Sequence, residues 1–354
     1  MNDYPALLKK YINVVVHEGG SDLHFSTGAH PTIRVAGALS PMLKEPVLTG
    51  EDTQGFLKAL ISPELEQRFR EHQEIDFAYE SPEKYRFRGN AYFQRGAISI
   101  ALRLIPKQIL TVKDLNLPDV LTSFARKEQG FFLVVGPVGQ GKTTTLASLI
   151  ELINSERMEH IITIEDPVEY LFEPKQSLID QREVGIDTKD FASALLSAFR
   201  EDVDVILVGE MRGPETMAAA VTAAETGHLV FSTLHTNNAA QTIDRIIDTF
   251  PGGQQDQIRL QLAASLAGIF SQRLVPRISG GRIPSYELLI NNKAVANLIR
   301  EKRTHEINTV IETGMTEGMI DMNRSLAELV ARGEITPESA YQHSLNPNVL
   351  QKLL

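Results

Sequence analysis

The stretch 136–143 constrains the fold of this chain more than any other part of it. It reads Gly-Pro-Val-Gly-Gln-Gly-Lys-Thr, which matches the pattern G-x-x-x-x-G-K-[ST]. The apolar run 131–135 precedes it, and apolar residues at helical spacing follow it, namely Leu146, Leu149, Ile150 and Ile153. A strand, a glycine loop and a helix in that order predict an α/β domain whose loop wraps a phosphate group.

The residue types in this loop explain why it would bind phosphate. Glycines allow consecutive backbone N–H groups to turn inward, and the start of the following helix adds positive potential. We expect Lys142 to reach the β- and γ-phosphates of a nucleotide and the Thr143 hydroxyl to ligate Mg²⁺. The predicted nucleotide-binding residues are Gly136, Pro137, Val138, Gly139, Gln140, Gly141, Lys142, Thr143 and Thr144.

Further short apolar runs predict a parallel sheet around this loop. They lie at 161–164, 205–208 and 229–231, and each is followed by a helical pattern. Such runs are typical of strands that are buried on both faces of an α/β sheet. From about residue 291 to the end the pattern is helical and charged.

An acidic residue stands at each end of the run 205–208. The two carboxylates, Asp204 and Glu210, are about 20 Å apart in an extended strand and therefore cannot share one site. Ligands of α/β sheets bind beyond the carboxyl ends of the strands, which favours Glu210. A glutamate there can orient the water that attacks a γ-phosphate.

A second acidic cluster, at 165–169, follows the run 161–164. It reads Glu-Asp-Pro-Val-Glu, so Glu165 and Glu169 would lie at the same edge of the sheet. Hard cations prefer oxygen ligands, and we expect these carboxylates to hold Mg²⁺ directly or through water. An ordinary turn after a strand is the alternative interpretation of this cluster taken alone.

Two histidines flank the run 229–231. His235 follows the strand and could sense a γ-phosphate or the neighbouring carboxylates, whereas the role of His228, which precedes the strand, is less clear. A zinc site is not expected, because the chain has no cysteine and no further ligands stand at suitable spacing.

The first 105 residues alternate as a sheet does. The segments 85–93 and 98–105 place apolar side chains on one face of a hairpin and Arg86, Arg88 and Arg103 on the other. The arginine face is either functional or simply solvated, and the residues alone leave both interpretations open. Between Pro106 and Pro118 the strand pattern stops, which favours a linker.

Composition narrows the class of protein. The 354 residues carry 35 Lys and Arg against 45 Asp and Glu, and this net charge of −10 argues against a dedicated nucleic-acid binder. The absence of cysteine excludes disulfides and thiolate chemistry. Neither a secretory signal nor an apolar stretch long enough to span a membrane stands out, so we expect a cytoplasmic globular protein.

The four motifs, in this order, resemble those of the secretion ATPase superfamily, where they are termed Walker A, Asp box, Walker B and His box. More narrowly, the chain resembles the retraction ATPases of type IV pili. The resemblance covers nearly the whole length and includes residues 20–24 (Gly-Ser-Asp-Leu-His), 209–212 (Gly-Glu-Met-Arg) and 297–301 (Asn-Leu-Ile-Arg-Glu).

This resemblance implies the fold and the domain order. We expect an α/β protein with an N-terminal α+β PAS-like domain at 1–108, a linker at 109–119, a RecA-like P-loop ATPase domain at 120–290 and a helical C-terminal region at 291–354. It also implies a homo-hexameric ring that binds ATP and Mg²⁺ in the cytoplasm. Such a ring is associated peripherally with the inner membrane through a platform protein of the pilus machine.

The resemblance also assigns roles to residues. It makes Glu210 the catalytic glutamate of Walker B and Glu169 the carboxylate of the Asp box, and it makes His228 and His235 the histidine pair. The superfamily brings arginines of the N-terminal domain to the nucleotide, and a rigid guanidinium fork suits that role. The arginines expected to act in this way are Arg88, Arg95 and Arg103.

Three segments depart from the usual pattern of the superfamily. Residues 202–204 read Asp-Val-Asp where Asp-Pro-Asp is common, and Gly213–Pro214 replaces an acidic residue after Walker B. Residues 294–296 read Ala-Val-Ala in place of Ala-Ile-Arg. The lost arginine affects how that helix would couple to retraction and does not affect the binding of ATP.

The predicted function is therefore an ATP-hydrolysing motor that retracts type IV pili and drives twitching motility. An accessory retraction ATPase and an assembly ATPase of pili or type II secretion are the alternatives. The chain lacks the four-cysteine zinc module that assembly ATPases often carry. A non-catalytic nucleotide-gated scaffold could dispense with Glu210, and a DNA translocase would need a basic channel with stacking aromatic residues.

Overall fold

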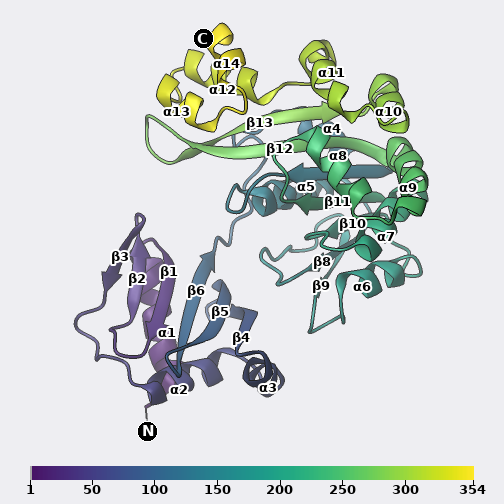
Figure 1. The fold of residues 1–354 in the computed structure, drawn as a ribbon. Coiled ribbons are helices and arrows are strands. Elements are labelled where there is room, and N and C mark those ends of the chain that lie inside the picture. Colours follow the sequence, from purple (N-terminus) through teal and green to yellow (C-terminus); the bar gives the residue numbers. More distant parts are fainter. Residues whose placement is uncertain (1) are drawn as a thin grey trace. The chain divides into compact units, whose positions relative to one another are not determined.

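The computed structural model describes residues 2–354, which form two compact units (Figure 1). The first unit contains the described residues up to Gln108 together with the short segment Asp166–Leu171. The second contains Ile109–Glu165 and Phe172–Leu354. Separation of the second unit into a linker, an ATPase domain and a C-terminal region stays a prediction.

The N-terminal unit is built on a six-stranded antiparallel sheet with the strand order β3-β2-β1-β6-β5-β4. Three helices accompany it, each with a side-chain cap at its N-terminus. The strands are β1 (Gly20–Ser26), β2 (Thr32–Val35), β3 (Ala38–Pro41), β4 (Glu74–Glu80), β5 (Arg86–Gln94) and β6 (Ala97–Ile105). The helices are α1 (Tyr4–His17), α2 (Gly50–Leu60) and α3 (Pro63–His72).

Strand alternation gives this sheet one apolar and one polar face. Phe25, Phe87 and Leu102 are fully buried in the core that the sheet shares with α1 and α2. On the opposite face Arg103 lies directly across from Asp22 on one side and from Arg88 on the other. The alternation in the sequence therefore places both arginines on the polar face, as expected.

The turn between β5 and β6 consists of Arg95 and Gly96. Both have positive φ, 51° and 76° respectively, which is the backbone of a two-residue type I′ hairpin turn. Arg95 therefore stands at the tip of the hairpin, away from the row that contains Arg88 and Arg103.

The C-terminal unit contains a seven-stranded sheet with the order β13-β12-β7-β11-β10-β8-β9. All neighbours in it run parallel except β13, which pairs antiparallel with β12. The strands are β7 (Gly130–Val135), β8 (His160–Glu165), β9 (Leu178–Glu183), β10 (Val205–Val208), β11 (Leu229–Leu234), β12 (Leu266–Pro276) and β13 (Arg282–Ile290). Every residue of β7, β10 and β11 is buried, as continuous apolar runs predict for parallel strands.

Helices cover this sheet and extend beyond it. Both α5 and α7 pack on the central strands β7 and β11, while α9 packs against α7 and α10. The helices around the sheet are α4 (Leu121–Ala125), α5 (Lys142–Glu156), α6 (Phe191–Ala198), α7 (Pro214–Glu225), α8 (Ala239–Asp248) and α9 (Gly252–Ser265).

The last part of the chain is helical (Figure 1). Helices α12 (Met322–Ala331), α13 (Pro337–His343) and α14 (Pro347–Leu353) enclose a small core of their own, which includes Val275 of β12 and Ile283 of β13. Two more helices, α10 (Lys293–Arg300) and α11 (Ile307–Thr313), and two 3₁₀ turns, η1 (Thr304–Glu306) and η2 (Met315–Glu317), precede them. Over the described residues, every helix is too short or too polar to traverse a bilayer.

Candidate active site

The glycine loop lies between β7 and α5, at the carboxyl end of a central strand. Gly136, Gly139 and Gly141 have φ values of 147°, 75° and 80°, which other residues rarely adopt. Gly141 is the N-cap of α5 and supplies no side-chain cap, so the first amides of a fifteen-residue helix face the loop. Together these features form an anion-binding concavity at the start of a helix.

A strand that the sequence analysis did not single out braces this loop. Gln272 of β12 is buried, and its Nε2 donates to the Gln140 carbonyl at 2.8 Å while its Oε1 accepts from Thr145 Oγ1 at 2.6 Å. In return, the amide of Leu274 donates to Gln140 Oε1 at 2.7 Å. A Cβ on Gly136 would approach the Gln272 carbonyl to 2.4 Å, so only glycine fits there.

Lys142 is the buried cation of the site. Only 7% of its surface is exposed, and its Nζ donates to the carbonyls of Gly136 at 2.8 Å and Pro137 at 2.9 Å. Burial lowers the pKa of this ammonium to about 8, although the charge of Glu210 acts in the opposite direction. A cation that has lost water in this way gains most from an anionic ligand.

Glu210 and His235 lie beside Lys142, as their positions after parallel strands predict. His235 Nδ1 is 3.4 Å from Lys142 Nζ, and His235 Nε2 is 3.8 Å from Glu210 Oε2. An ammonium can only donate, so Nδ1 accepts and the ring proton sits on Nε2, facing Glu210. Burial and the charge of Lys142 lower the pKa of His235, which keeps the ring neutral near pH 7.

Arg212 is the second residue of this site that the sequence analysis did not assign. Its guanidinium forms an ion pair with Glu210 Oε1. The motif 209–212 contained the signal, because an arginine two residues after a strand-end glutamate can reach the same edge of the sheet. Glu210 thus faces a cation on one side and the neutral ring of His235 on the other.

Hydrogen bonds join the ends of β8, β10 and β11 at Gly209, the residue before Glu210. The Gly209 amide donates to the Ile164 carbonyl at 2.8 Å, and Thr233 Oγ1 donates to the Gly209 carbonyl at 2.7 Å. Glu165, at the end of β8, is buried and accepts from Thr163 Oγ1 at 2.7 Å. It therefore lies at the predicted edge of the sheet, in the same unit as Thr143.

Glu169 belongs to the segment Asp166–Leu171, which packs with the N-terminal unit. Arg88 Nη1 donates to Glu169 Oε1 at 3.1 Å, and Arg86 holds the Val168 carbonyl through Nε and Nη2 at 3.1 and 2.9 Å. The proposed Mg²⁺ ligands Glu165 and Glu169 therefore fall in different units. Their shared role at one metal ion stays a prediction.

Arg103 is held by its inner nitrogen. Its Nε donates to Asp22 Oδ1 at 3.0 Å, which leaves 71% of the side chain exposed. Arg88, Arg95 and Arg103 all lie in the N-terminal unit, and their role toward a nucleotide stays a prediction.

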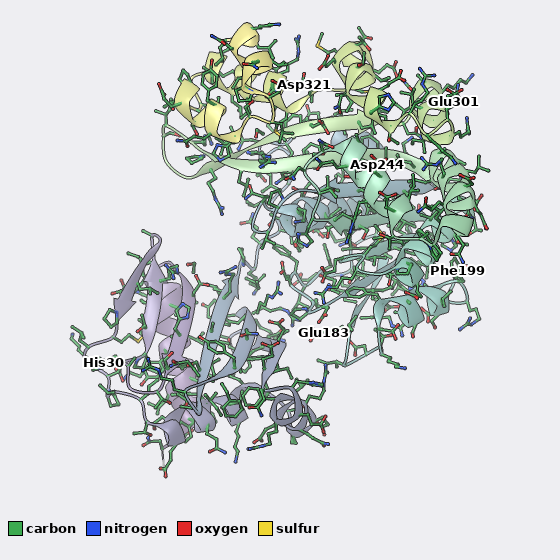
Figure 2. The ribbon with its side chains drawn as sticks, viewed as in Figure 1. His30, Glu183, Phe199, Asp244, Glu301 and Asp321 are labelled. Atoms are coloured by element: carbon green, nitrogen blue, oxygen red, sulfur yellow. The ribbon has the colours of Figure 1, made fainter. Side chains whose placement is uncertain are left out.

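His228 does not join the site within one chain. It precedes β11, at the opposite end of the strand from His235. Its Nδ1 lies 3.0 Å from the Ala223 carbonyl, and its ring forms a T-shaped pair with Phe199, which is labelled in Figure 2. Within a single chain His228 thus lies away from the glycine loop, and its catalytic role stays a prediction.

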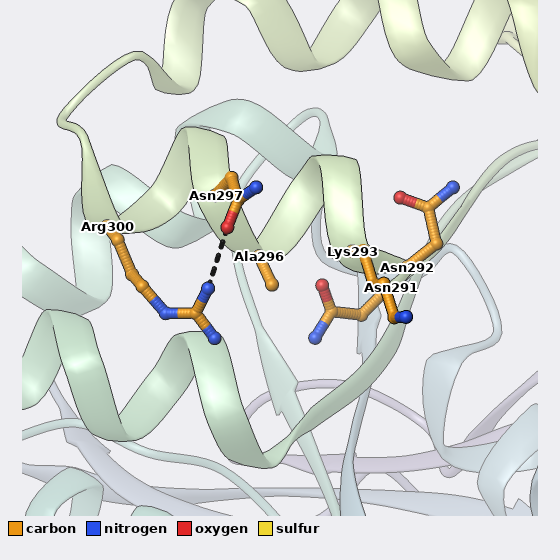
Figure 3. Close-up of a pocket in the computed structure, with 6 residues that line it drawn as sticks. All are labelled: Asn291, Asn292, Lys293, Ala296, Asn297 and Arg300. Atoms are coloured by element: carbon orange, nitrogen blue, oxygen red, sulfur yellow. Dashed lines mark hydrogen bonds between the residues drawn. The ribbon is translucent and has the colours of Figure 1, made fainter.

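A shallow hollow of about 580 Å³ lies at the start of α10 and along its first two turns (Figure 3). Arg300 Nη1 donates to Asn297 Oδ1 at 2.8 Å on one side of it. The hollow is lined by Asn291, Asn292, Lys293, Ala296, Asn297 and Arg300. Ala296, at the third position of the segment 294–296, is one of the lining residues.

Comparison with known proteins agrees with this geometry. Residues 3–343 match the family model described as type II/IV secretion system protein. The chain belongs to this family. A family member from Neisseria gonorrhoeae, named twitching motility protein, is 44% identical over 317 residues, which are 89% of this chain and 84% of that protein.

Two further members of the family match almost end to end. The type IV pilus retractation ATPase PilT of Pseudomonas aeruginosa is 42% identical over 93% of this chain and 96% of its own length. A solved structure described as the pilus retraction motor PilT with bound ADP has a TM-score of 0.90 and 46% identity. That alignment covers 97% of this chain and 98% of the other. The predicted fold class and superfamily are confirmed, and the predicted retraction ATPase agrees with these names.

Proposed function

We propose that the protein is an ATP-hydrolysing motor that retracts type IV pili and so drives twitching motility. The observation that carries this proposal is the convergence of Lys142, Glu210 and His235 at the glycine loop. Similarity to retraction proteins over nearly the whole length supports it. A buried ammonium and a helix start facing the same concavity favour a phosphate ligand, and we infer that it is ATP because similar proteins are a retraction ATPase and a motor with bound ADP.

Each residue of the site has a role in this proposal. The backbone N–H groups of residues 138–141 and the Lys142 ammonium would hold the phosphates, and the Thr143 hydroxyl would hold Mg²⁺, with Glu165 and Glu169 acting through water. When bound, Mg²⁺ supplies charge neutralisation at the phosphate oxygens. Glu210 orients the attacking water and accepts its proton, while the neutral ring of His235 keeps Glu210 in place.

The assembly is part of the same proposal. We infer a homo-hexamer in which Arg88, Arg95 or Arg103 of one subunit serves the nucleotide of its neighbour. We infer also a position at the cytoplasmic face of the inner membrane, reached through a platform protein of the pilus machine. Nucleic acid is not among the proposed partners, because the net charge is −10.

Glu210→Gln tests the catalytic assignment. The amide keeps the shape of the side chain and removes the base, so we expect ATP to bind with unchanged affinity while phosphate release falls about a hundredfold or more. Glu225→Gln is a matched control, because Glu225 ends α7 and its carboxylate accepts an exposed hydrogen bond from Gln261. Turnover by Glu210→Gln at the unmutated rate would refute the role of Glu210.

Deleting the gene tests the direction of the motor. A retraction motor predicts long filaments that persist and cells that do not spread on a surface. Cells without filaments would instead support pilus assembly as the function. Complementation with Glu210→Gln should leave the filaments as long as in the deletion strain.

A further inference from the structure

Glu287 of β13 is a buried carboxylate to which the chemistry above gives no role. Only 5% of it is exposed. Its Oε1 accepts from the backbone N–H of Ala239 at 2.7 Å and from Ser271 Oγ at 3.3 Å. Burial raises the pKa of this carboxyl to about 7, and the charge of Asp321, labelled in Figure 2, acts in the same direction. Burying a carboxylate costs free energy, so the hydrogen bonds that Glu287 accepts are the feature to explain.

The donor Ala239 connects Glu287 to the active site. Ala239 is the first residue of α8, and only Thr236, Asn237 and Asn238 separate it from His235. Its amide is one of the helix-start donors that have no partner inside the helix. Because the amide is buried and the helix start is positive, a carboxylate is a strong acceptor for it.

Each of the three residues between His235 and α8 makes a side-chain hydrogen bond. Thr236 Oγ1 is 2.7 Å from Thr242 Oγ1, and Arg273 Nη2 donates to Asn237 Oδ1 at 3.0 Å. Asn238 Oδ1 caps α8 by accepting from the Gln241 amide at 2.8 Å. The segment 235–238 therefore has little freedom of its own, and its position follows the position of the start of α8.

We propose that Glu287 is a positioning residue of the ATPase site, which holds the Ala239 amide and thereby keeps His235 within reach of Lys142 and Glu210. This inference rests on the proposed function, because it acts through His235. Loss of the carboxylate would leave a buried amide without an acceptor and would let the start of α8 move. A displacement of His235 by a fraction of an ångström is enough to weaken its contacts with the two charged groups.

Two substitutions at Glu287 separate hydrogen bonding from packing. Glu287→Gln keeps an acceptor oxygen in the same place, and we expect its kcat to stay within about twofold of the unmutated protein. Glu287→Leu keeps the bulk and removes the acceptor, and we expect kcat to fall about tenfold with little change in KM. Rescue by glutamine and a loss confined to kcat are not expected of a purely structural residue.

A double-mutant cycle with His235→Ala tests the route of action. If Glu287 acts through His235, adding Glu287→Leu to His235→Ala should lower kcat no further. Thr304→Val is the control, because Thr304 Oγ1 donates to Asp244 of the same helix α8 at 2.7 Å, away from its start. We expect this control to lower the melting temperature and to leave kcat unchanged. Asp244 is labelled in Figure 2.

Three outcomes would overturn the proposal: unchanged kcat in Glu287→Leu, an equal loss in Glu287→Gln, or additive losses in the cycle. Should Glu287→Leu not fold, Glu287→Asp gives the same test, because the shorter side chain withdraws the carboxylate from Ala239. Failure of the proposed function itself would look different. The unmutated protein would then release no phosphate from ATP, whatever residue 287 is.

Discussion

Lys142 illustrates how burial prepares a side chain for a ligand. Its ammonium makes two hydrogen bonds to loop carbonyls, yet its pKa is lowered to about 8, because carbonyl dipoles replace water incompletely. Phosphate oxygens stabilise the charged form and therefore raise this pKa. Nucleotide binding must then be linked to proton uptake by Lys142.

Calorimetric titration with ATP in buffers of different ionisation enthalpy measures this linkage. At about pH 8 we expect roughly half a proton to be taken up by Lys142 per ATP bound, and almost none from this residue at about pH 6. ATP affinity should fall as the pH rises above 8, because the neutral amine must first be protonated. Lys142→Arg is the control, since a guanidinium stays charged throughout. Equal proton uptake by this variant would contradict the assignment.

Residues whose position follows from a strand end can be predicted from the amino-acid sequence. Glu210 and His235 could be predicted because each comes a few residues after an apolar run, and parallel strands end at one edge of the sheet. Gln272 and Glu287 could not be predicted in this way. Both residues lie within strands and not at strand ends. The strand pairings that bring them near the loop or the start of α8 leave no local motif in the sequence.

At the scale of elements, the glycine loop depends on a neighbouring strand as much as on its own glycines. Gln272 joins β12 to the loop through the Gln140 carbonyl and to the first turn of α5 through Thr145 Oγ1. Since all three groups are buried or partly buried, loss of the amide leaves two of them without a partner. The loop would then have to be ordered by the nucleotide itself.

Gln272→Leu tests this brace. We expect the free energy of unfolding to fall by about 1–3 kcal/mol, the cost of unsatisfied buried polar groups, and the dissociation constant for ATP to rise. Urea denaturation and a fluorescent nucleotide titration measure the two effects. Gln176→Leu serves as the matched substitution, because Gln176 is exposed and lies away from the loop. If both variants bind ATP as the unmutated protein does, β12 does not brace the loop.

The strands β12 and β13, which form a hairpin, could not be predicted from hydrophobic patterns in the sequence. Ser271, Gln272 and Glu287 are polar but buried, so neither strand shows a regular alternation or a continuous apolar run. The parallel strands β7, β8, β10 and β11 were predicted, although β11 extends three residues beyond the predicted run, to Leu234. When polar side chains are buried as hydrogen-bonded pairs, the hydrophobic pattern of the sequence no longer indicates a strand.

At the scale of the whole molecule, the hexamer proposal makes a prediction about which chain supplies an arginine. Arg103 is anchored by Asp22 through Nε, so both terminal nitrogens of its guanidinium can face a ligand. In one chain this arginine and the glycine loop lie in different units. Whether it serves its own nucleotide or that of a neighbour can be tested with mixed rings.

Mixing Arg103→Ala with Lys142→Ala protomers tests action across subunits. Each variant alone should be inactive or nearly so. In mixtures, Arg103→Ala subunits contribute intact loops and Lys142→Ala subunits contribute the arginine, so we expect ATPase activity to exceed that of either variant alone. Arg245→Ala, at the end of α8, replaces Arg103→Ala in the control mixture. Mixtures without any gain would indicate that Arg103 does not act across the interface.

The β12–β13 hairpin contacts three parts of the second unit. It holds the glycine loop through Gln272, the start of α8 through Glu287, and the core of the last three helices through Val275 and Ile283. Any partner that grips those C-terminal helices more firmly in one nucleotide state must alter nucleotide affinity by the same factor, since thermodynamic coupling is reciprocal. Mechanical load on the C-terminal helices would then change the affinity of the site for its nucleotide.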